Sequence, residues 1–282
     1  MKRRAFLETV LLSSAGAVLY PAFAQAGGLR TITYNVLQCS GWPKEVAQAR
    51  VGGFAEQMPA RYAMELALYR PDIITYQECP EESVIKAIAE HLGMNYVLFE
   101  SGGYWPGALM TRFEILAWQN HPTVDGERPE ALFTRHWGKA RLRDAERDQE
   151  YVVHSAHLHP SDDAIRHDEV TAMLEAMRDE IAADTPMILQ GDLNHDPDKP
   201  SYARWQEAGL VDCYAKAGEG EAMTFTADTP SVRIDYVWVN AALAGRLTSA
   251  RTLYEGAFRL NLQDEQSFAL SDHLPVLAAF SA

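Results

Sequence analysis

The sequence predicts one α/β or α+β domain in which strands outnumber helices. Three features predict this class: short apolar runs with period-two alternation, helical stripes between some of these runs, and no internal repeat or low-complexity linker after residue 26. The length of 282 residues suits one large domain, and the contents of 47% hydrophobic and 23% charged residues are those of a globular protein. Disordered, collagen-like and coiled-coil proteins are therefore disfavoured.

The N-terminal half alternates strands and helices. Residues 29–37 place Ile32, Tyr34 and Val36 on one face and two threonines with Asn35 on the other, which predicts a strand. Helices are expected over 59–69 and over 81–92, the second ending at Gly93. Further strands are expected at 73–76, 96–99, 108–111 and 115–118, followed by a polar loop over 119–130.

The C-terminal half contains the clearest helix, over residues 164–183. Its apolar stripe includes Val170, Met173 and Met177. Strands are expected at 151–158, 186–190, 233–239 and 274–280. The pattern gives the class of the domain but does not fix the order of strands in its sheets.

The first 26 residues have the features of an export signal. Basic residues 2–4 precede an apolar run over 10–24, and small-x-small cleavage sites follow at 22–24 and 24–26. The segment Arg3-Arg4-Ala5-Phe6-Leu7 resembles the twin-arginine pattern, with an ordinary secretory signal or an uncleaved anchor as alternatives. We therefore expect residues 1–26 to be a twin-arginine-like signal peptide and residues 27–282 to form the mature domain, in the periplasm or secreted.

The three cysteines, Cys39, Cys79 and Cys213, form neither a disulfide framework nor a zinc-binding pattern. We expect half-buried free thiols, with a Cys39–Cys79 bridge as the alternative in an oxidising compartment.

Polar side chains stand where the predicted strands end. An ionised group is costly to bury unless it is paired or bound to a metal ion. Taken singly, these positions have simpler explanations: residues 191–194 form a good turn sequence, 271–273 a helix cap, and His157 a buried core histidine. Asp235 is harder to explain in this way, because aspartate is uncommon in strands and seldom buried without a partner. Together these positions suggest one shared cleft.

Seven segments in order carry a more specific pattern. They are Thr33-Tyr34-Asn35-Val36, Pro71-Asp72-Ile73-Ile74 with Gln77-Glu78, Gly107-Ala108-Leu109-Met110-Thr111-Arg112-Phe113, His157-Leu158, Gly191-Asp192-Leu193-Asn194, Arg233-Ile234-Asp235-Tyr236-Val237 and Ser271-Asp272-His273-Leu274-Pro275-Val276. In this order the chain resembles the endonuclease/exonuclease/phosphatase family of metal-dependent phosphoesterases, over about residues 29–280. The family includes deoxyribonuclease I-like and exonuclease III-like nucleases and sphingomyelinases. The resemblance implies a four-layer sandwich of two packed mixed β-sheets flanked by helices.

The resemblance also implies a metal site. Asn35 and Glu78 match the family's metal-binding amide and carboxylate, and Asp272 matches a further metal contact. Hard oxygen ligands suit Mg²⁺ or Mn²⁺.

The remaining matches are catalytic. Asp192 and Asn194 match the residues that position and polarise the attacking water. His273 matches the histidine that contacts the phosphate, and Asp235 matches the carboxylate that orients this histidine. His157 resembles the second histidine of the deoxyribonuclease and sphingomyelinase branches. Either Asp192 or a histidine acts as the general base.

The function expected from these residues is an exported metal-dependent phosphoesterase that hydrolyses a mono- or diester by in-line attack of water. The alternatives are a nuclease, a sphingomyelinase-like phospholipase C and a non-catalytic binding protein on the same fold. The formal net charge is −14, and it becomes −16 when three basic residues and Glu8 leave with the signal segment. Because nucleic acid repels an acidic surface, nucleic acid is the disfavoured alternative to another phosphoester substrate. We also expect no stable membrane anchor and a monomer.

Overall fold

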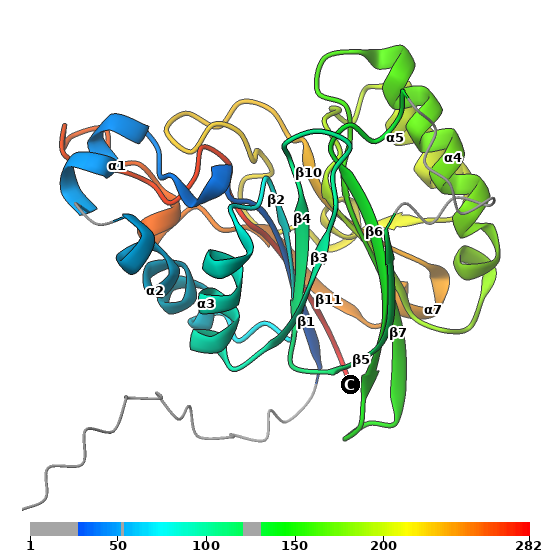
Figure 1. Ribbon diagram of the computed structural model, residues 1–282. Coiled ribbons are helices and arrows are strands. Elements are labelled where there is room, and N and C mark those ends of the chain that lie inside the picture. The colour runs from blue at the N-terminus through cyan, green and yellow to red at the C-terminus, as the bar shows by residue number, and fades with distance from the viewer. Residues whose placement is uncertain (1–27, 52–53, 121–130) are drawn as a thin grey trace, which may run out of the picture.

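The computed structural model describes residues 28–51, 54–120 and 131–282. In these ranges two six-stranded mixed sheets pack face to face, with helices on both outer faces (Figure 1). The four-layer sandwich implied by the resemblance is therefore confirmed. The signal peptide predicted for residues 1–26 lies outside the described residues, so it stays a prediction.

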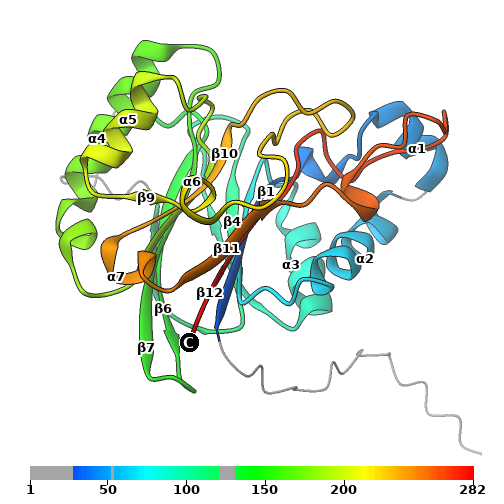
Figure 2. The same cartoon turned by 180° about the vertical axis from the view of Figure 1, so that it is seen from behind.

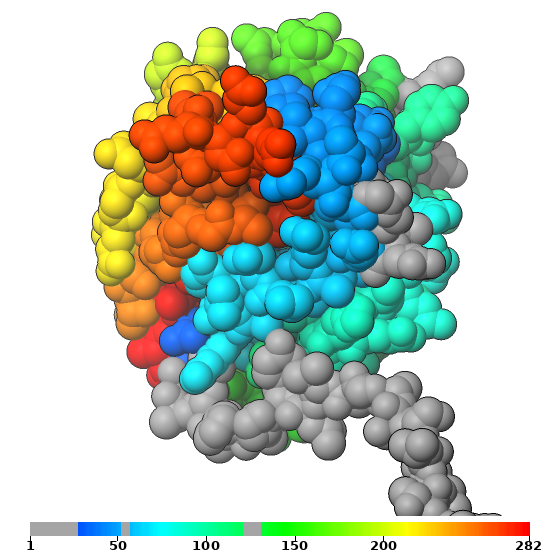
Figure 3. All heavy atoms as spheres, turned by 90° about the vertical axis from the view of Figure 1, so that its left-hand side faces the viewer, coloured from blue at the N-terminus to red at the C-terminus, as the bar shows by residue number. Residues whose placement is uncertain are grey.

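The first sheet has the strand order β11-β12-β1-β2-β4-β3, in which only β1 and β2 are parallel neighbours. Helices α2 (Phe54–Ala67) and α3 (Glu82–Leu92) cover its outer face (Figure 1). Helix α1 (Lys44–Val51) lies beside the orange segment near residue 260, which fits the bridge between Trp42 and Ala269 (Figure 3). The strands are β1 (Leu29–Asn35), β2 (Ile73–Gln77), β3 (Asn95–Phe99), β4 (Gly107–Thr111), β11 (Leu247–Thr252) and β12 (Val276–Phe280).

The second sheet has the order β5-β6-β7-β8-β10-β9, in which only β7 and β8 are parallel neighbours. Helices α4 (Asp163–Ala182) and α5 (Pro200–Glu207) lie on its outer side (Figure 2). The strands are β5 (Glu114–Asn120), β6 (His136–Asp144), β7 (Gln149–His157), β8 (Met187–Asp192), β9 (Val211–Asp212) and β10 (Asp235–Val239). Shorter elements are α6 (Cys213–Ala217), α7 (Ala241–Ala244) and the 3₁₀ turns Leu37–Cys39 and Gly256–Phe258.

An apolar cluster lies in each of the three spaces between the four layers. The alternation predicted for β1 is present: Ile32 and Tyr34 pack toward the helices, whereas Leu29 faces the second sheet. On α4, Val170 and Met173 pack against the second sheet. None of the helices in the described ranges combines the length and the hydropathy that a membrane span requires.

Several sequence expectations need correction. Strand β6 was not predicted, because its outward positions carry Lys139, Arg141 and Arg143, which dilute the apolar alternation of its inward face. Strand β5 includes residues 119 and 120, which were expected in a loop, and the rest of that loop lies outside the described residues. Helix α2 begins at Phe54 rather than at Pro59.

The cysteines also differ from expectation. Cys39, Cys79 and Cys213 are fully buried rather than half-buried, and all three are free thiols. Burial raises the pKa of each thiol above its ordinary value. The Cys39–Cys79 bridge is therefore absent, and none of the three thiols is in a reactive environment.

Candidate active site

The candidate site lies where β1, β2, β7 and β8 end, at the end of the sandwich opposite to the C-terminus (Figure 1). The parallel pairs bring their carboxyl ends to one edge of each sheet. In the second sheet the register aligns His157, Asp192 and Asp235 across three neighbouring strands. Side chains aligned in this way project from the same face of the sheet, here toward the first sheet.

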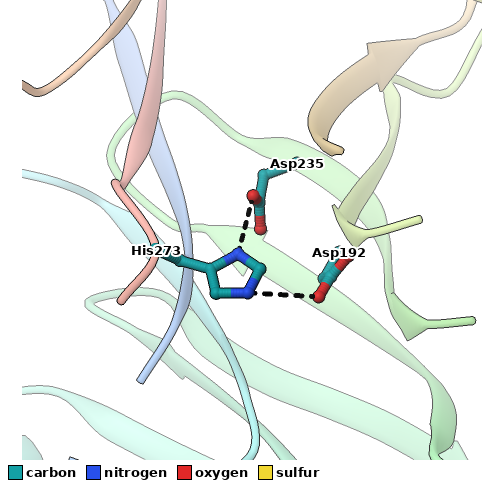
Figure 4. Close-up of side chains that lie close together, drawn as sticks. All are labelled: Asp192, Asp235 and His273. Atoms are coloured by element: carbon teal, nitrogen blue, oxygen red, sulfur yellow. Dashed lines mark hydrogen bonds and ion pairs between the residues drawn. The ribbon is translucent and has the colours of Figure 1, made fainter. Parts of the chain in front are cut away.

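His273 and Asp235 form the hydrogen-bonded pair that the sequence predicted. The Nδ1 of His273 lies 3.0 Å from Oδ2 of Asp235, and both side chains are buried (Figure 4). Asp235 begins β10, where its backbone N–H donates to the hydroxyl of Thr224. The ring of Phe225 packs against the imidazole of His273, with centroids 4.8 Å apart. The ring of His273 is thus held from two sides.

Asp192 lies at the centre of the site. Its Oδ2 is 3.5 Å from Nε2 of His157 and 3.8 Å from Nε2 of His273 (Figure 4), and it accepts a hydrogen bond of 3.1 Å from the amide of Asn35. The preceding residue, Gly191, has a φ of 153°, and a Cβ there would lie 1.8 Å from the carbonyl oxygen of Ala156. Glycine therefore allows β8 to approach β7 where Asp192 enters the site.

Asn35 joins the two sheets. Its amide nitrogen also donates to Oε1 of Glu78 at 3.2 Å, and its Oδ1 accepts from the backbone N–H of Leu37. Glu78 follows β2 with a φ of 54°, which turns its side chain out of the strand pattern. Burial raises the pKa of Glu78 above its ordinary value, and the negative charge of the nearby, half-buried Asp272 raises it further. Asn35 therefore contacts both Glu78 and Asp192, and Asp272 lies near Glu78.

The two site histidines have opposite electrostatic environments. Burial by itself would lower the pKa of His273, but the charge and hydrogen bond of Asp235, together with Asp192 and Asp272, raise it to about 10. Burial lowers the pKa of His157 well below its ordinary value, and the nearby His136 and Arg135 add to this shift. At neutral pH, His273 is an imidazolium and His157 is a neutral imidazole.

The donor set fits a hard divalent cation. Glu78, Asp192 and Asp235 are three carboxylates in one largely buried site, and burial raises the pKa of Asp192 to about 7. Oδ1 of Asp235 is buried without a hydrogen bond. This excess of carboxylate oxygens, without cysteine, suits Mg²⁺ or Mn²⁺. Among the described residues, Asp192, Asp235 and His273 offer ligand atoms that all lie within 4.8 Å of one another. The set Asn35, Glu78 and Asp272 stays a prediction.

Asn194 lies at the edge of the site. Its backbone N–H donates to Oδ1 of Asp192 at 3.1 Å, and its side-chain amide donates to the carbonyl of Leu158 at 2.9 Å. This contact links the turn after β8 to the end of β7. Asn194 is the last of the eight predicted residues, and all eight lie at this end of the sandwich. His195, which directly follows, is buried: its Nε2 accepts a hydrogen bond of 3.1 Å from the indole N–H of Trp205, and its ring stacks on that of Tyr236 with centroids 5.0 Å apart.

The sequence of the chain matches the endonuclease/exonuclease/phosphatase family over residues 32–273. The chain belongs to this family. Its members are divalent-metal-dependent phosphoester hydrolases, and they act on phosphoester or nucleic acid substrates. A search of curated proteins found no match.

Solved structures share the fold of this family member at low sequence identity. A family protein from Bacteroides thetaiotaomicron is 19% identical with a TM-score of 0.73, covering 90% of this chain and 98% of its own. A mannosyl-6-phosphatase from the same organism is 19% identical with a TM-score of 0.71, covering 89% and 98%. D. rerio TDP2, in complex with a single-stranded DNA product, is 19% identical with a TM-score of 0.62, covering 90% and 99%.

Three features of this family member's site were missed by sequence reasoning. Phe225 contacts His273. Burial raises the pKa of Glu78 and lowers that of His157, and the positive charge of Arg135 makes a smaller, lowering contribution to both. Gln190 lies between the sheets beneath Asp192. Only Gln190 had a signal in the sequence: a polar side chain inside the apolar segment Met187-Ile188-Leu189-Gln190.

Proposed function

We propose that this chain is an exported, metal-dependent phosphoesterase that hydrolyses a phosphate mono- or diester by in-line attack of water. The observation that carries the proposal is the placement of His273 between Asp235 and Asp192. A histidinium held in this way can donate a hydrogen bond from Nε2 to a phosphoryl oxygen, where negative charge increases in the transition state.

The other residues divide the remaining work. Asp192 and Asn194 orient the attacking water, and Asp192 or the neutral His157 accepts its proton. Asp235 fixes the tautomer and the direction of the His273 ring. Glu78, Asn35 and Asp272 would hold the divalent metal ion, which would neutralise charge on the phosphate.

A phosphoester other than nucleic acid fits the charges best. The formal net charge is −14, and the basic residues of β6 and its following turn are each engaged in an ion pair. These pairs are Lys139–Glu180, Arg141–Glu150, Arg143–Asp148 and Arg147–Asp144. A nuclease would need such residues free along the cleft. The mannosyl-6-phosphatase of the same fold is one precedent for a small phosphoester.

A sphingomyelinase-like activity has less support. Between residues 100 and 107, all of them described, the one exposed large apolar side chain is Tyr104, which is 88% exposed. Insertion into a membrane interface needs a larger apolar surface. We further propose that residues 1–26 direct the monomeric enzyme to the periplasm or out of the cell, as a twin-arginine-like signal. An intact Met1 in protein taken from the native periplasm would contradict cleavage.

A substrate screen tests the proposed activity. The chain without residues 1–26 is assayed with Mg²⁺ or Mn²⁺ on nitrophenyl phosphate, bis-nitrophenyl phosphate, DNA and sphingomyelin. We expect hydrolysis of a nitrophenyl ester that EDTA abolishes and either metal restores. Full activity in metal-free enzyme would contradict the metal site, and cleavage of DNA alone would favour the nuclease.

A further inference from the structure

A layer of neutral polar side chains is buried between the two sheets, directly beneath the candidate site. Its members are Thr31 and Thr33 of β1, Thr75 and Gln77 of β2, and Gln190 of β8, each with no exposed surface. They precede Asn35, Glu78 and Asp192 along their own strands. Gln190 and Asp192 project from the same face of β8, as do Thr33 and Asn35 on β1.

Apolar side chains fill the other end of the same inter-sheet space. There, the same three strands carry Leu29, Ile73 and Ile188, which belong to one apolar cluster. The inter-sheet space can therefore be filled by apolar residues, and on these three strands the polar side chains lie toward the end that holds the site.

Hydrogen bonds connect the members of this polar layer into one chain. The hydroxyl of Thr31 donates to Oε1 of Gln190 at 2.7 Å. The Nε2 of Gln190 donates to the carbonyl of Ile32 and to the hydroxyl of Thr75, both at 3.0 Å. Thr75 donates to Thr33 at 3.1 Å, and Thr33 donates to Oε1 of Gln77 at 3.2 Å. Gln190 is thus the member of the second sheet that forms hydrogen bonds to both β1 and β2 of the first sheet.

Stability alone does not account for such a layer. A buried polar network with all its hydrogen bonds made adds little more to the free energy of unfolding than apolar residues of the same shape would, because its hydrogen bonds replace those made with water. What the network does supply is a fixed geometry, since each hydrogen bond tolerates only a narrow range of distances and angles. Active sites need their groups held to about 0.5 Å.

We propose that Gln190 is a positioning residue that sets the separation between β1 and β8, and with it the contact between Asn35 and Asp192. These two side chains come from different sheets and meet at 3.1 Å, two residues beyond Thr33 and Gln190 on their strands. The proposal rests on the proposed function, because it assigns Asn35 to the metal-binding side of the site and Asp192 to the water-binding side.

The test compares buried isosteric substitutions inside and outside the layer. Gln190→Met and Thr31→Val remove network hydrogen bonds at nearly constant volume. Thr252→Val is the matched control, because Thr252 is also buried in the first sheet but bonds to Ala222 outside the layer. For each purified protein, Mn²⁺ binding after EDTA treatment and dialysis is measured by electron paramagnetic resonance, with kcat, KM and Tm alongside.

We expect Gln190→Met to weaken Mn²⁺ binding and to lower kcat by about 10-fold each, the lower end of the range for residues that orient metal ligands. Thr31→Val should lower both by about 3-fold, and KM should change less than kcat. Thr252→Val should stay within about 2-fold on every measure except Tm. In an Asn35→Ala background, Gln190→Met should add less than about 2-fold to the loss of kcat while still lowering Tm, since the network then has no contact left to position.

The alternative outcomes are distinct. Gln190→Met and Thr31→Val proteins that bind Mn²⁺ and turn over like the Thr252→Val protein would overturn the proposal. If Gln190→Met does not fold, the comparison of Thr31→Val with Thr252→Val decides it. If the unmodified enzyme hydrolyses no phosphoester, the proposed function fails, and the Mn²⁺ measurements still decide whether the layer positions the site.

Discussion

Two buried histidines, each paired with a carboxylate, lie on opposite faces of the second sheet, and they differ in charge. At the site, His273 lies 3.0 Å from Asp235. On the helix side, Nε2 of His154 lies 2.7 Å from Glu180 of α4. Burial lowers the pKa of both rings, but the carboxylates around His273 raise its pKa above the ordinary value, whereas the pKa of His154 remains lowered. The neutral histidine, His154, is therefore the one with the shorter contact to its carboxylate.

The second ring nitrogen explains the difference. The indole N–H of Trp137 donates to Nδ1 of His154 at 3.1 Å, so this nitrogen has to stay unprotonated and the ring has to stay neutral. In addition, Lys139 lies 2.9 Å from Glu180 and repels a proton on His154. The second nitrogen of His273 faces Asp192 instead, which favours a proton there. A histidine beside a carboxylate is thus charged or neutral according to what its other nitrogen meets.

The largest expected effect separates the two pairs by activity. His273→Ala should lower kcat by about 10²-fold or more, because it removes the imidazolium that donates to the phosphate. Asp235→Asn should lower kcat similarly, because the imidazolium then loses the carboxylate that orients it. The double variant should be little worse than either single variant, since the two residues act as a unit. His154→Leu should keep kcat within about 2-fold. Steady-state kinetics on the nitrophenyl ester measure all four, and fully additive losses for His273 and Asp235 would show that they act separately.

The second effect separates the pairs by stability. His154→Leu leaves the indole N–H of Trp137 and the carboxylate of Glu180 without their partner, so it should lower the free energy of unfolding by about 1–3 kcal/mol. Urea denaturation measures this loss. Glu180→Gln, which can keep a hydrogen bond to His154, should cost less. Equal losses for the two variants would mean that stability depends on the negative charge of Glu180, which also pairs with Lys139.

The sequence alone could separate His154 from His157 by alternation, although it could not identify their partners. The two residues are three positions apart on β7, so they project from opposite faces of the sheet. The strand-end residues were predictable because seven short segments occur in a fixed order. The partner of His154 is 26 positions away on a helix, and Thr31 meets Gln190 across 159 positions. Such contacts depend on how the sheets pack, which local patterns do not encode.

Strand β6 illustrates the same limit. Its inward positions include His136, Ala140 and Leu142, and its outward positions are mostly cationic. In the folded protein those cations pair with carboxylates from β7, from α4 and from the turn between β6 and β7. Without these partners in view, the segment has the composition of a basic surface loop. Short strands with a clear apolar alternation were thus predictable from the sequence. A strand such as β6, whose outer face is covered by ion pairs, was not.

A smaller effect is the dependence of stability on pH. Burial lowers the pKa of His154 below 6.5, so the unfolded chain takes up this proton first as the pH falls. Burial opposes ionisation of Glu180, but hydrogen bonds from His154 and Lys139 lower its pKa from 4.5 to about 2, so the unfolded chain again protonates first. Both groups therefore make the fold less stable as the pH falls from about 6.5 toward 2. A His154→Gln/Glu180→Gln variant should show a shallower loss in denaturation measured across this range. Glu150→Gln, in an exposed pair, is the control and should leave the slope unchanged.

The smallest expected effect tests the cause of the difference between the pairs. Trp137→Phe removes the donor to Nδ1 of His154 and leaves Glu180 in place, so His154 should become able to accept a second proton. We expect the pKa of His154 to rise toward or above its ordinary value of 6.5, measured by NMR titration of the histidine rings. Phe133→Leu is the matched control, because the ring of Phe133 lies 5.0 Å from that of Trp137 and its loss changes packing without removing the indole. A pKa of His154 that stays low in the Trp137→Phe protein would assign the neutral ring to burial and to Lys139. A rise in that variant but not in the control would show that one indole N–H keeps this pair neutral, while the pair at the site, which lacks such a donor, carries the charge.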